Sequence, residues 1–376
     1  MVLAPHRSKT TQSPPRARPF PVTGFETIPP SIKLEEEQLP FYSANNFYPV
    51  RLGQVFRGRY QVVAKLGYGT TSTTWLGHDL PSQRFVTLKV HINTLQHNQE
   101  LLVYQRLKTI TASDHAGQYS IRMLQYFFEV DGPHGVHQVF VLPPLGISLR
   151  SLQERMPGGV FNGAFVRAAL QQSIPALDFL HSDANITHTD FHSGNLLVGL
   201  RGESLLTECE EAEFTKPTAR KEARIGSQHK GLAMPIPYRA PEILLGMEWG
   251  HSVDMWSVAL VAWDLLEPDS LFRIYDSRDQ ELNQLHHLAD VVALLGPPPK
   301  EFLSPKYAHV FHLSRKWIGA VPIPTHRSLE SLGRSLQGDE KAAFLDFIGA
   351  LLRWLPEERL TTAEAYLHPW MAQQGT

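Results

Sequence analysis

The sequence predicts an α+β fold, because strand-like and helix-like patterns occupy different stretches of one chain. Apolar runs of strand length occur at Tyr60–Leu66, Val86–Val90 and Val136–Leu142. The stretch Phe165–Leu180 instead repeats its apolar residues every three to four positions, the spacing of an amphipathic helix. All three strand-like runs precede this helix in the chain.

Length, charge and cysteine content limit the class of protein. The chain has 376 residues, which favours two or three compact units, and 42% of them are hydrophobic, as in a globular protein. The formal net charge of −2 provides no basic field for nucleic acid or a membrane surface. The single Cys209 cannot form an intramolecular disulfide, and the best apolar stretch, Ser257–Leu266, is too short to span a bilayer. We therefore expect an intracellular protein of the cytoplasm, the nucleus or both.

The first 40 residues are predicted to lie outside the compact part. Residues 1–25 combine basic residues with proline and contain no acidic residue. This composition resembles a mitochondrial presequence, but the prolines between Pro14 and Pro21 would break the amphipathic helix that such a signal needs. We expect a disordered basic tail, followed by an acidic linker that begins at Glu35.

The stretch His188–Asn195 places an acidic residue and an amide in a polar loop between apolar runs. In phosphoryl transfer, a carboxylate such as Asp190 can accept the proton of the attacking hydroxyl, and the amide oxygen of Asn195 can bind Mg²⁺. Two other interpretations stay open on this stretch alone. Asp190 and Asn195 can be ordinary turn residues. Alternatively, His188, Asp190 and His192 can face one side of an extended segment and bind a metal.

His188-Thr189-Asp190, with Asn195 five residues after the Asp, resembles the catalytic loop of protein kinases. Thr189 stands where most of these kinases have Arg, and in this respect the loop is similar to that of the SR-protein kinases, the SRPK family. The same pattern also resembles the loop of aminoglycoside and choline kinases, which phosphorylate small molecules. The rest of the chain has to distinguish these classes.

A glycine-rich stretch follows the first strand-like run. Gly67-Tyr68-Gly69 resembles the loop that covers the phosphates of ATP in kinases, with Ser72 in place of the third glycine. The resemblance implies that this loop contacts the nucleotide from Leu66 through Gly67, Tyr68 and Gly69 to Ser72, and that Thr74 packs near adenine.

A lysine and a glutamate then follow in the order that kinases use. Lys89 lies within an apolar strand-like run, where a charged group needs a partner. It resembles the lysine that contacts the α- and β-phosphates, and Glu100, at the start of the next helical stretch, resembles its ion-pair partner.

Pro143-Pro144-Leu145-Gly146 ends the third strand-like run and resembles the hinge between the two kinase lobes. The resemblance implies that backbone groups near Pro143 and Leu145 hold adenine, and that Leu142 limits the back of the pocket. Pro144 has no N–H, but Leu145 keeps the donor that the hinge needs.

One kinase element is missing. Between Asn195 and Ala240 the chain has no aspartate, whereas protein kinases place there the Asp-Phe-Gly whose Asp binds magnesium. Glu222–Gly226 is similar to the residues that normally follow this motif. The preceding Leu205–Phe214 resembles an acidic insert of fungal SRPK-like sequences, and we expect its glutamates to be solvated.

The C-terminal part carries motifs that small-molecule kinases lack. Ala240-Pro241-Glu242 matches the end of the kinase activation segment, and Glu242 is expected to pair with Arg359. Ser252–Ser257 matches the start of a long buried helix, in which Asp254 would bind the backbone of the catalytic loop. These matches favour a protein kinase over a metal-binding protein.

The resemblance therefore implies a bilobal protein-kinase fold with a small β-rich N-lobe and a larger helical C-lobe. Residues 1–40 would be the tail and linker, and residues 41–142 the lead-in and N-lobe. Residues 143–372 would be the hinge and C-lobe, with the acidic insert near 201–221. The implied reaction transfers the γ-phosphoryl group of ATP, with Mg²⁺, to Ser or Thr of proteins, including Arg-Ser repeats linked to mRNA splicing. The resemblance also implies a monomer that binds neither nucleic acid nor membrane directly.

Two functions of different class remain open. In an active Ser/Thr kinase, Asp190 is the base, Lys89 holds the phosphates and Asn195 binds the metal. The missing Asp instead favours a pseudokinase that keeps the fold without the chemistry, and His192 also replaces the lysine that steadies the transferred phosphate. A mis-joined sequence near Arg220–Glu222 would explain the gap as well. We further expect the acidic stretch Glu208–Glu213 to attract basic substrates.

Overall fold

The computed structural model describes residues 17–29, 31–39, 42–95, 97–110, 114–221, 236–275, 279–302, 310–312 and 316–373. The chain forms two compact units. Unit 1 comprises residues 1–104, 122–145 and 199–231, and unit 2 comprises residues 105–121, 146–198 and 232–376. The acidic insert thus belongs to unit 1, although the sequence predicts it as part of the C-lobe. Residues 1–16 of the expected tail, residues 40 and 41, and Glu222–Gly226 lie outside the described residues.

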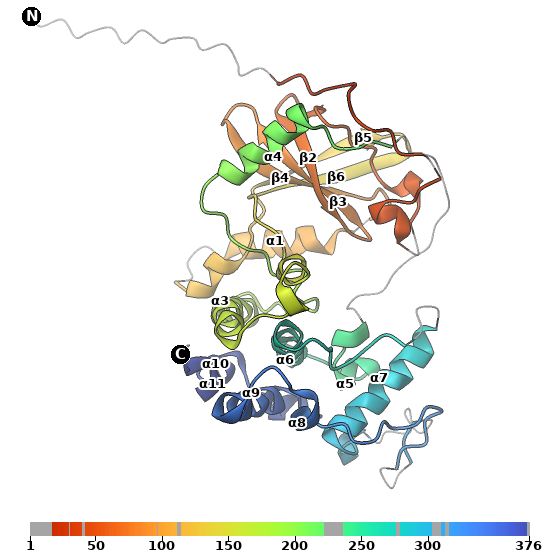
Figure 1. Cartoon of the computed structure of the whole chain (residues 1–376), viewed down its shortest axis with the longest axis vertical. Helices are drawn as coiled ribbons and strands as arrows, with labels where there is room; N and C mark the ends of the chain where they lie inside the picture. Colours follow the sequence, from red (N-terminus) through yellow and green to blue (C-terminus); the bar gives the residue numbers. More distant parts are fainter. Residues whose placement is uncertain are drawn as a thin grey trace, which may run out of the picture. The chain divides into compact units, whose positions relative to one another are not determined.

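Unit 1 is built on an antiparallel sheet with the strand order β1-β2-β3-β4-β6-β5 (Figure 1). Its strands are β1 Val55–Phe56, β2 Tyr60–Tyr68, β3 Ser72–Asp79, β4 Arg84–His91, β5 Tyr126–Gly132 and β6 Gly135–Leu142. The runs are rich in Val, Phe and Tyr, which suit a pleated and partly buried backbone. Consecutive side chains point to opposite faces, so Val62 and Val63 belong to different buried clusters.

The two faces of the sheet are covered differently. On one face, aromatic and branched side chains pack among themselves and against the lead-in segment, whose Tyr48 and Val50 contact this cluster. On the other face, helix α1 (Gln99–Thr109) places Leu101 and Tyr104 against the buried Phe140 of β6. Helix α1 is thereby held directly on the strand that leads to the hinge.

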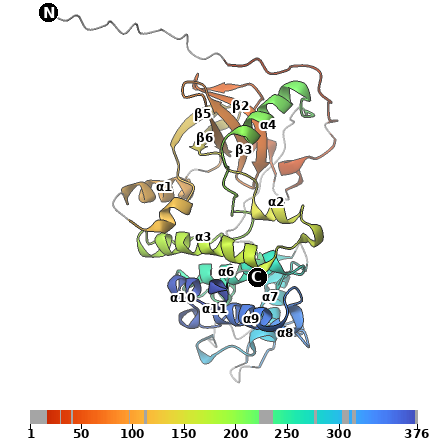
Figure 2. The same cartoon turned by 60° about the vertical axis from the view of Figure 1, so that its left-hand side comes forward.

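Helix α4 (Ser204–Thr215) and an N-terminal segment cover the rest of this second face (Figures 1 and 2). Their apolar residues form one buried cluster with the sheet: Phe20, Val63, Leu76, Phe85 and Leu206. The rings of Phe20 and Phe214 lie 4.6 Å apart. The buried Gln61 side chain accepts a hydrogen bond from the Arg18 N–H at 2.9 Å and donates one to the Arg18 carbonyl at 2.7 Å. Arg18 and Phe20 therefore pack on the sheet, in contrast to the expected disordered tail.

The acidic residues of α4 face partners of their own. Glu210 is buried and lies 3.4 Å from the Arg18 guanidinium and 3.7 Å from His78 Nδ1. Glu213 is also buried and accepts hydrogen bonds from the backbone and hydroxyl of Thr218. Glu211 pairs with Arg18 at 2.6 Å. The prediction of a solvated acidic run is therefore wrong for Glu210 and Glu213, because both carboxylates are buried within unit 1.

Unit 2 is helical. Its helices are α2 Leu149–Gln153, α3 Gly163–Ser182, α5 Pro241–Leu244, α6 Ser252–Leu266, α7 Gln280–Leu295, α8 Leu329–Leu332, α9 Gly338–Leu351, α10 Thr362–Tyr366 and α11 Pro369–Ala372. Helix α6 is apolar on all sides and packs between α3 and α9 (Figure 2). The side chains of Trp256 and Trp263 are fully buried in it. Among the described residues, no helix combines the length and apolarity needed to cross a membrane.

Candidate nucleotide-binding and catalytic sites

The ion pair expected on the sheet is present in unit 1. Lys89 lies on β4 and Glu100 in the first turn of α1, and the lysine Nζ is 2.6 Å from Glu100 Oε2. Burial alone would raise the pKa of Glu100. A hydrogen bond from His91 and the charge of Lys89 outweigh burial and lower this pKa to about 2. Glu100 is therefore a carboxylate at neutral pH and holds the Lys89 ammonium in one place.

The glycine-rich stretch is the turn between β2 and β3. The N–H of Gly69 donates to the carbonyl of Ser72 at 2.8 Å, and Gly67 pairs with Thr74 across the hairpin. A Cβ added at Gly67 would meet no atom within 4 Å, and one added at Gly69 would meet only the Ser72 carbonyl, at 3.9 Å. Packing within the protein therefore does not require these glycines. A ligand that approaches the backbone closely would require them.

A single methyl group tests this interpretation. We expect Gly67→Ala to leave the melting temperature unchanged and to weaken ATP binding by roughly tenfold, or about 1.4 kcal/mol. Fluorescent-nucleotide titration and thermal unfolding measure the two quantities. Gly250→Ala, at an exposed glycine of unit 2 that also has open space around it, is the matched control. Equal ATP affinity in Gly67→Ala and wild type would mean that the hairpin does not contact the nucleotide.

The backbone carbonyl of Pro143, in the predicted hinge, accepts hydrogen bonds from a side chain that the sequence did not indicate. Leu142 ends β6 and is buried, as expected for a residue at the back of a pocket. The next carbonyl, that of Pro143, accepts hydrogen bonds from Arg122 Nε at 2.9 Å and Nη2 at 2.7 Å. The same Nη2 donates to Thr87 Oγ1 on β4 at 2.7 Å. Adenine would therefore share the Pro143 carbonyl with a guanidinium.

In unit 2, a fully buried carboxylate holds the catalytic-loop stretch. Asp254, in the first turn of α6, accepts the N–H of His188 at 2.7 Å and that of Thr189 at 2.8 Å. Its Oδ2 also lies 2.8 Å from His181 Nε2. Thr189 has a left-handed backbone, with φ +60°, a conformation that costs free energy outside glycine and persists when its surroundings enforce it. The hydrogen bonds from the His188 and Thr189 N–H groups to Asp254 hold Thr189 in this conformation.

Asp190 and Asn195 lie side by side at the end of this loop. Asn195 Nδ2 donates to the Asp190 carboxylate and to its backbone carbonyl, both at 2.8 Å. His192 Nε2 is 3.5 Å from the other carboxylate oxygen. Burial raises the pKa of Asp190, but the contacts with His192 and Asn195 prevail and lower it. An ionised and half-exposed carboxylate in this setting can accept a proton from a hydroxyl group.

The donor set for magnesium is incomplete. With its amide nitrogen on Asp190, Asn195 presents its amide oxygen, a suitable ligand for Mg²⁺. Among the described residues, however, no group of three or more His, Cys, Asp or Glu side chains could hold a metal ion. Glu210, Glu211 and Glu213 already have protein partners. The described residues therefore do not fit a complete magnesium site, and they do not support the metal interpretation of His188, Asp190 and His192.

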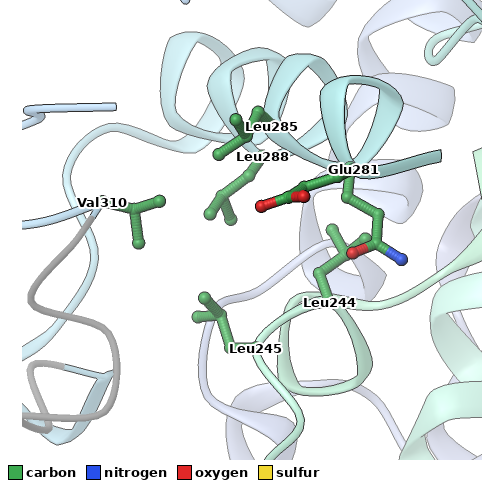
Figure 3. A pocket seen from close by; sticks show the side chains of 7 residues that line it. Leu244, Leu245, Glu281, Leu285, Leu288 and Val310 are labelled. Carbon is green, nitrogen blue, oxygen red and sulfur yellow. The ribbon is translucent and has the colours of Figure 1, made fainter. Parts of the chain in front are cut away.

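The last expected pair is also present. Arg359 and Glu242 form a bidentate, fully buried ion pair in unit 2, with nitrogen–oxygen distances of 2.6 and 2.7 Å. A separate pocket beside α5 and α7 is lined by Leu244, Leu245, Leu285, Leu288 and Val310, together with Glu281 and Gln284 (Figure 3). None of the residues predicted for the site lines this pocket.

Sequence reasoning missed His91, Arg122 and His181. His91 lies two residues after Lys89 on one strand, so strand periodicity places both side chains on the same face. This signal was present in the sequence. Arg122 and His181 act through backbone and long-range contacts, which no local pattern indicates.

Comparison with known proteins agrees with this geometry. The family model "Protein kinase domain" matches residues 60–371. A serine/threonine protein kinase of Aspergillus fumigatus is 35% identical over 96% of both chains. The serine/threonine-protein kinase SRPK of Physarum polycephalum is 28% identical over 90% of this chain and 92% of its own. SRSF protein kinase 3 of Mus musculus is 23% identical over 90% of each. The predicted bilobal α+β kinase fold is confirmed, and the chain belongs to the protein kinase family.

Proposed function

We propose that this chain is an active serine/threonine protein kinase that transfers the γ-phosphoryl group of ATP to protein hydroxyl groups. The observation that carries the proposal is the arrangement of Asp190, an ionised carboxylate that Asn195 orients on a loop fixed by Asp254. Such a group can act as the base for an attacking hydroxyl. The Lys89–Glu100 pair supports the same assignment from unit 1.

The protein's own residues divide the work of the transfer. Asp190 accepts the hydrogen bond of the substrate Ser or Thr hydroxyl and takes its proton as the oxygen attacks the γ-phosphorus. Lys89 neutralises charge on the α- and β-phosphates, where negative charge builds up as the bond to the γ-phosphorus breaks and ADP leaves. Magnesium, when bound, would add positive charge along the phosphates. No step is assigned to it because its ligand set is incomplete among the described residues.

We further propose basic, Ser-containing proteins such as Arg-Ser repeats as substrates, in support of mRNA processing. The names of two relatives, SRPK and SRSF protein kinase 3, support this choice. Glu210, Glu211 and Glu213 of α4 do not, because they already have partners within the protein.

The direct test is transfer of labelled phosphate from ATP to an Arg-Ser peptide in the presence of Mg²⁺. We expect incorporation into the peptide and a large reduction in the Asp190→Asn variant. A Lys-Ala peptide of equal charge, without hydroxyl groups, controls for adventitious label. Labelling of a neutral Ser peptide at the same rate would keep the kinase assignment but contradict the proposed preference for basic substrates.

A pseudokinase is the second candidate, and one specific observation favours it. No aspartate occurs between Asn195 and Ala240, and Glu210, Glu211 and Glu213 of α4 cannot replace it without leaving their partners. This candidate predicts nucleotide binding that Mg²⁺ does not strengthen, and no turnover. Metal-dependent turnover well above the Asp190→Asn background would exclude it. Sequencing the mature messenger RNA across the codons for Arg220–Glu222 shows whether it encodes an additional segment with Asp-Phe-Gly.

A further inference from the structure

His91 is a buried histidine that the proposed reaction does not yet use. It ends β4 two residues after Lys89, and only 2% of its surface is exposed. Its Nε2 lies 3.3 Å from Glu100 Oε2, the same oxygen that Lys89 Nζ contacts. Its Nδ1 lies 3.3 Å from the backbone carbonyl of Gln138 on β6. The ring therefore bridges α1 and β6 at the position of the Lys89–Glu100 pair.

Both partners of the ring can only accept hydrogen bonds. The carboxylate of Glu100 is ionised, and a backbone carbonyl has no proton to give. A neutral imidazole carries one N–H and satisfies one of these acceptors. The tautomer decides which one, and a hydrogen bond to an ionised carboxylate is the stronger of the two.

The surroundings of the ring come from three elements. They are Glu100 on α1, Lys89 on its own strand β4, and Gln138 and Phe140 on β6. The Phe140 ring lies 4.4 Å from the His91 ring and excludes water from that side. His137 Nδ1 is 2.9 Å from the backbone carbonyl of His91, so this neighbour donates to the backbone and does not compete for Glu100.

We propose that His91 is a positioning residue: its Nε2–H donates to the Glu100 carboxylate, and the carboxylate fixed in this way holds the Lys89 ammonium. Two donors from β4, Lys89 Nζ and His91 Nε2, then hold the Glu100 Oε2 of helix α1 against the sheet. The inference deepens the proposed kinase function, because a displaced Lys89 would misalign the phosphates. A displacement of about 1 Å at a reacting centre can cost ~10²-fold in rate.

Three variants separate positioning from stability. We expect His91→Leu, which removes the donor to Glu100, to lower kcat by about tenfold or more, with a smaller change in the KM for ATP. His91→Gln keeps one donor and should recover part of the rate. His137→Leu is the matched control, since His137 is equally buried in the neighbouring strand and does not contact Glu100.

Recovery of the rate by His91→Gln is a readout that a merely structural role would not change, because the amide restores a donor without restoring the ring. Equal rate losses in His91→Leu and His137→Leu, or a kcat of His91→Gln no higher than that of His91→Leu, would overturn the proposal.

A measurement on the folded protein distinguishes failure of this inference from failure of the kinase assignment. The ¹⁵N shifts of the histidine rings, assigned by difference with His91→Gln, show which ring nitrogen carries a proton, without any turnover. We expect His91 Nε2 to carry a proton in the wild type and its ¹⁵N shift to change in Glu100→Gln. If the chain transfers no phosphate but shows these shifts, the kinase function fails and the His91 inference stands. A wild-type His91 ring without a proton on Nε2 overturns the inference even when the chain is active.

Discussion

Replacing Asp190 by Asn should lower kcat for phosphoryl transfer by roughly 10²–10⁴-fold, the range that a positioned general base contributes. The amide has nearly the same size as the carboxylate, so the loop that Asp254 anchors should keep its shape. It cannot, however, take a proton from the substrate hydroxyl. Initial rates at saturating ATP and peptide measure the loss.

The acid side of the pH profile tests the same residue. Burial raises the pKa of Asp190, but its contacts with His192 and Asn195 prevail and lower it. The carboxylate is thus ionised at neutral pH, and the rate should fall only as the pH drops through this lowered pKa. Asp339→Asn, at an exposed position in the first turn of α9, serves as the control and should change neither the rate nor the profile. An Asp190→Asn rate equal to that of wild type would remove Asp190 from the mechanism.

Glu242→Gln should reduce the free energy of unfolding by about 3–5 kcal/mol, because it leaves the Arg359 guanidinium buried and without its counter-ion. The side chains of Arg359 and Glu242 are 0% and 1% exposed and share two hydrogen bonds. Arg359 also donates to the carbonyls of Arg353, Trp354 and Ser252, so it cannot turn out to water without further losses. Urea unfolding followed by tryptophan fluorescence measures the change.

A double variant separates the charge effect from loss of packing. Glu242→Gln combined with Arg359→Met removes both charges, and we expect it to be less destabilised than the sum of the two single variants. Lys341→Met, which breaks the more exposed pair with Glu330, is the comparison and should cost at most about 1 kcal/mol. Additive effects of the two buried substitutions would show that the pair itself is not coupled.

Much of the architecture could be predicted because the family motifs carry their own geometry. Lys89 with Glu100, and Glu242 with Arg359, are linked by motif order, and the structure contains both pairs. The strand-like runs and the Phe165–Leu180 helix also follow from periodicity, and they correspond to β2, β4, β6 and α3. Their functional roles stay predictions until activity is measured.

The insert could not be predicted for a physical reason. Leu205–Phe214 contains glutamates that local composition assigns to solvent, and the partner of Glu210 and Glu211, Arg18, lies far away in the sequence. Arg18 and Glu211, for example, are 193 positions apart. Periodicity within a window of a dozen residues carries no information about such a pairing. The packing of α4 on the sheet thus required the three-dimensional structure.

Helix α4 and residues 17–28 also determine when unit 1 can finish folding during synthesis. The ribosome delivers the sheet strands first, whereas Leu206 and Phe214, which close its second face, emerge only after the whole of α3 and the catalytic loop. Until then Val63, Leu76 and Phe85 remain partly uncovered on the nascent chain. Unit 1 therefore completes its core only after the chain has been extended past Phe214. In the interval the exposed apolar face of the sheet is a surface of the kind that chaperones bind.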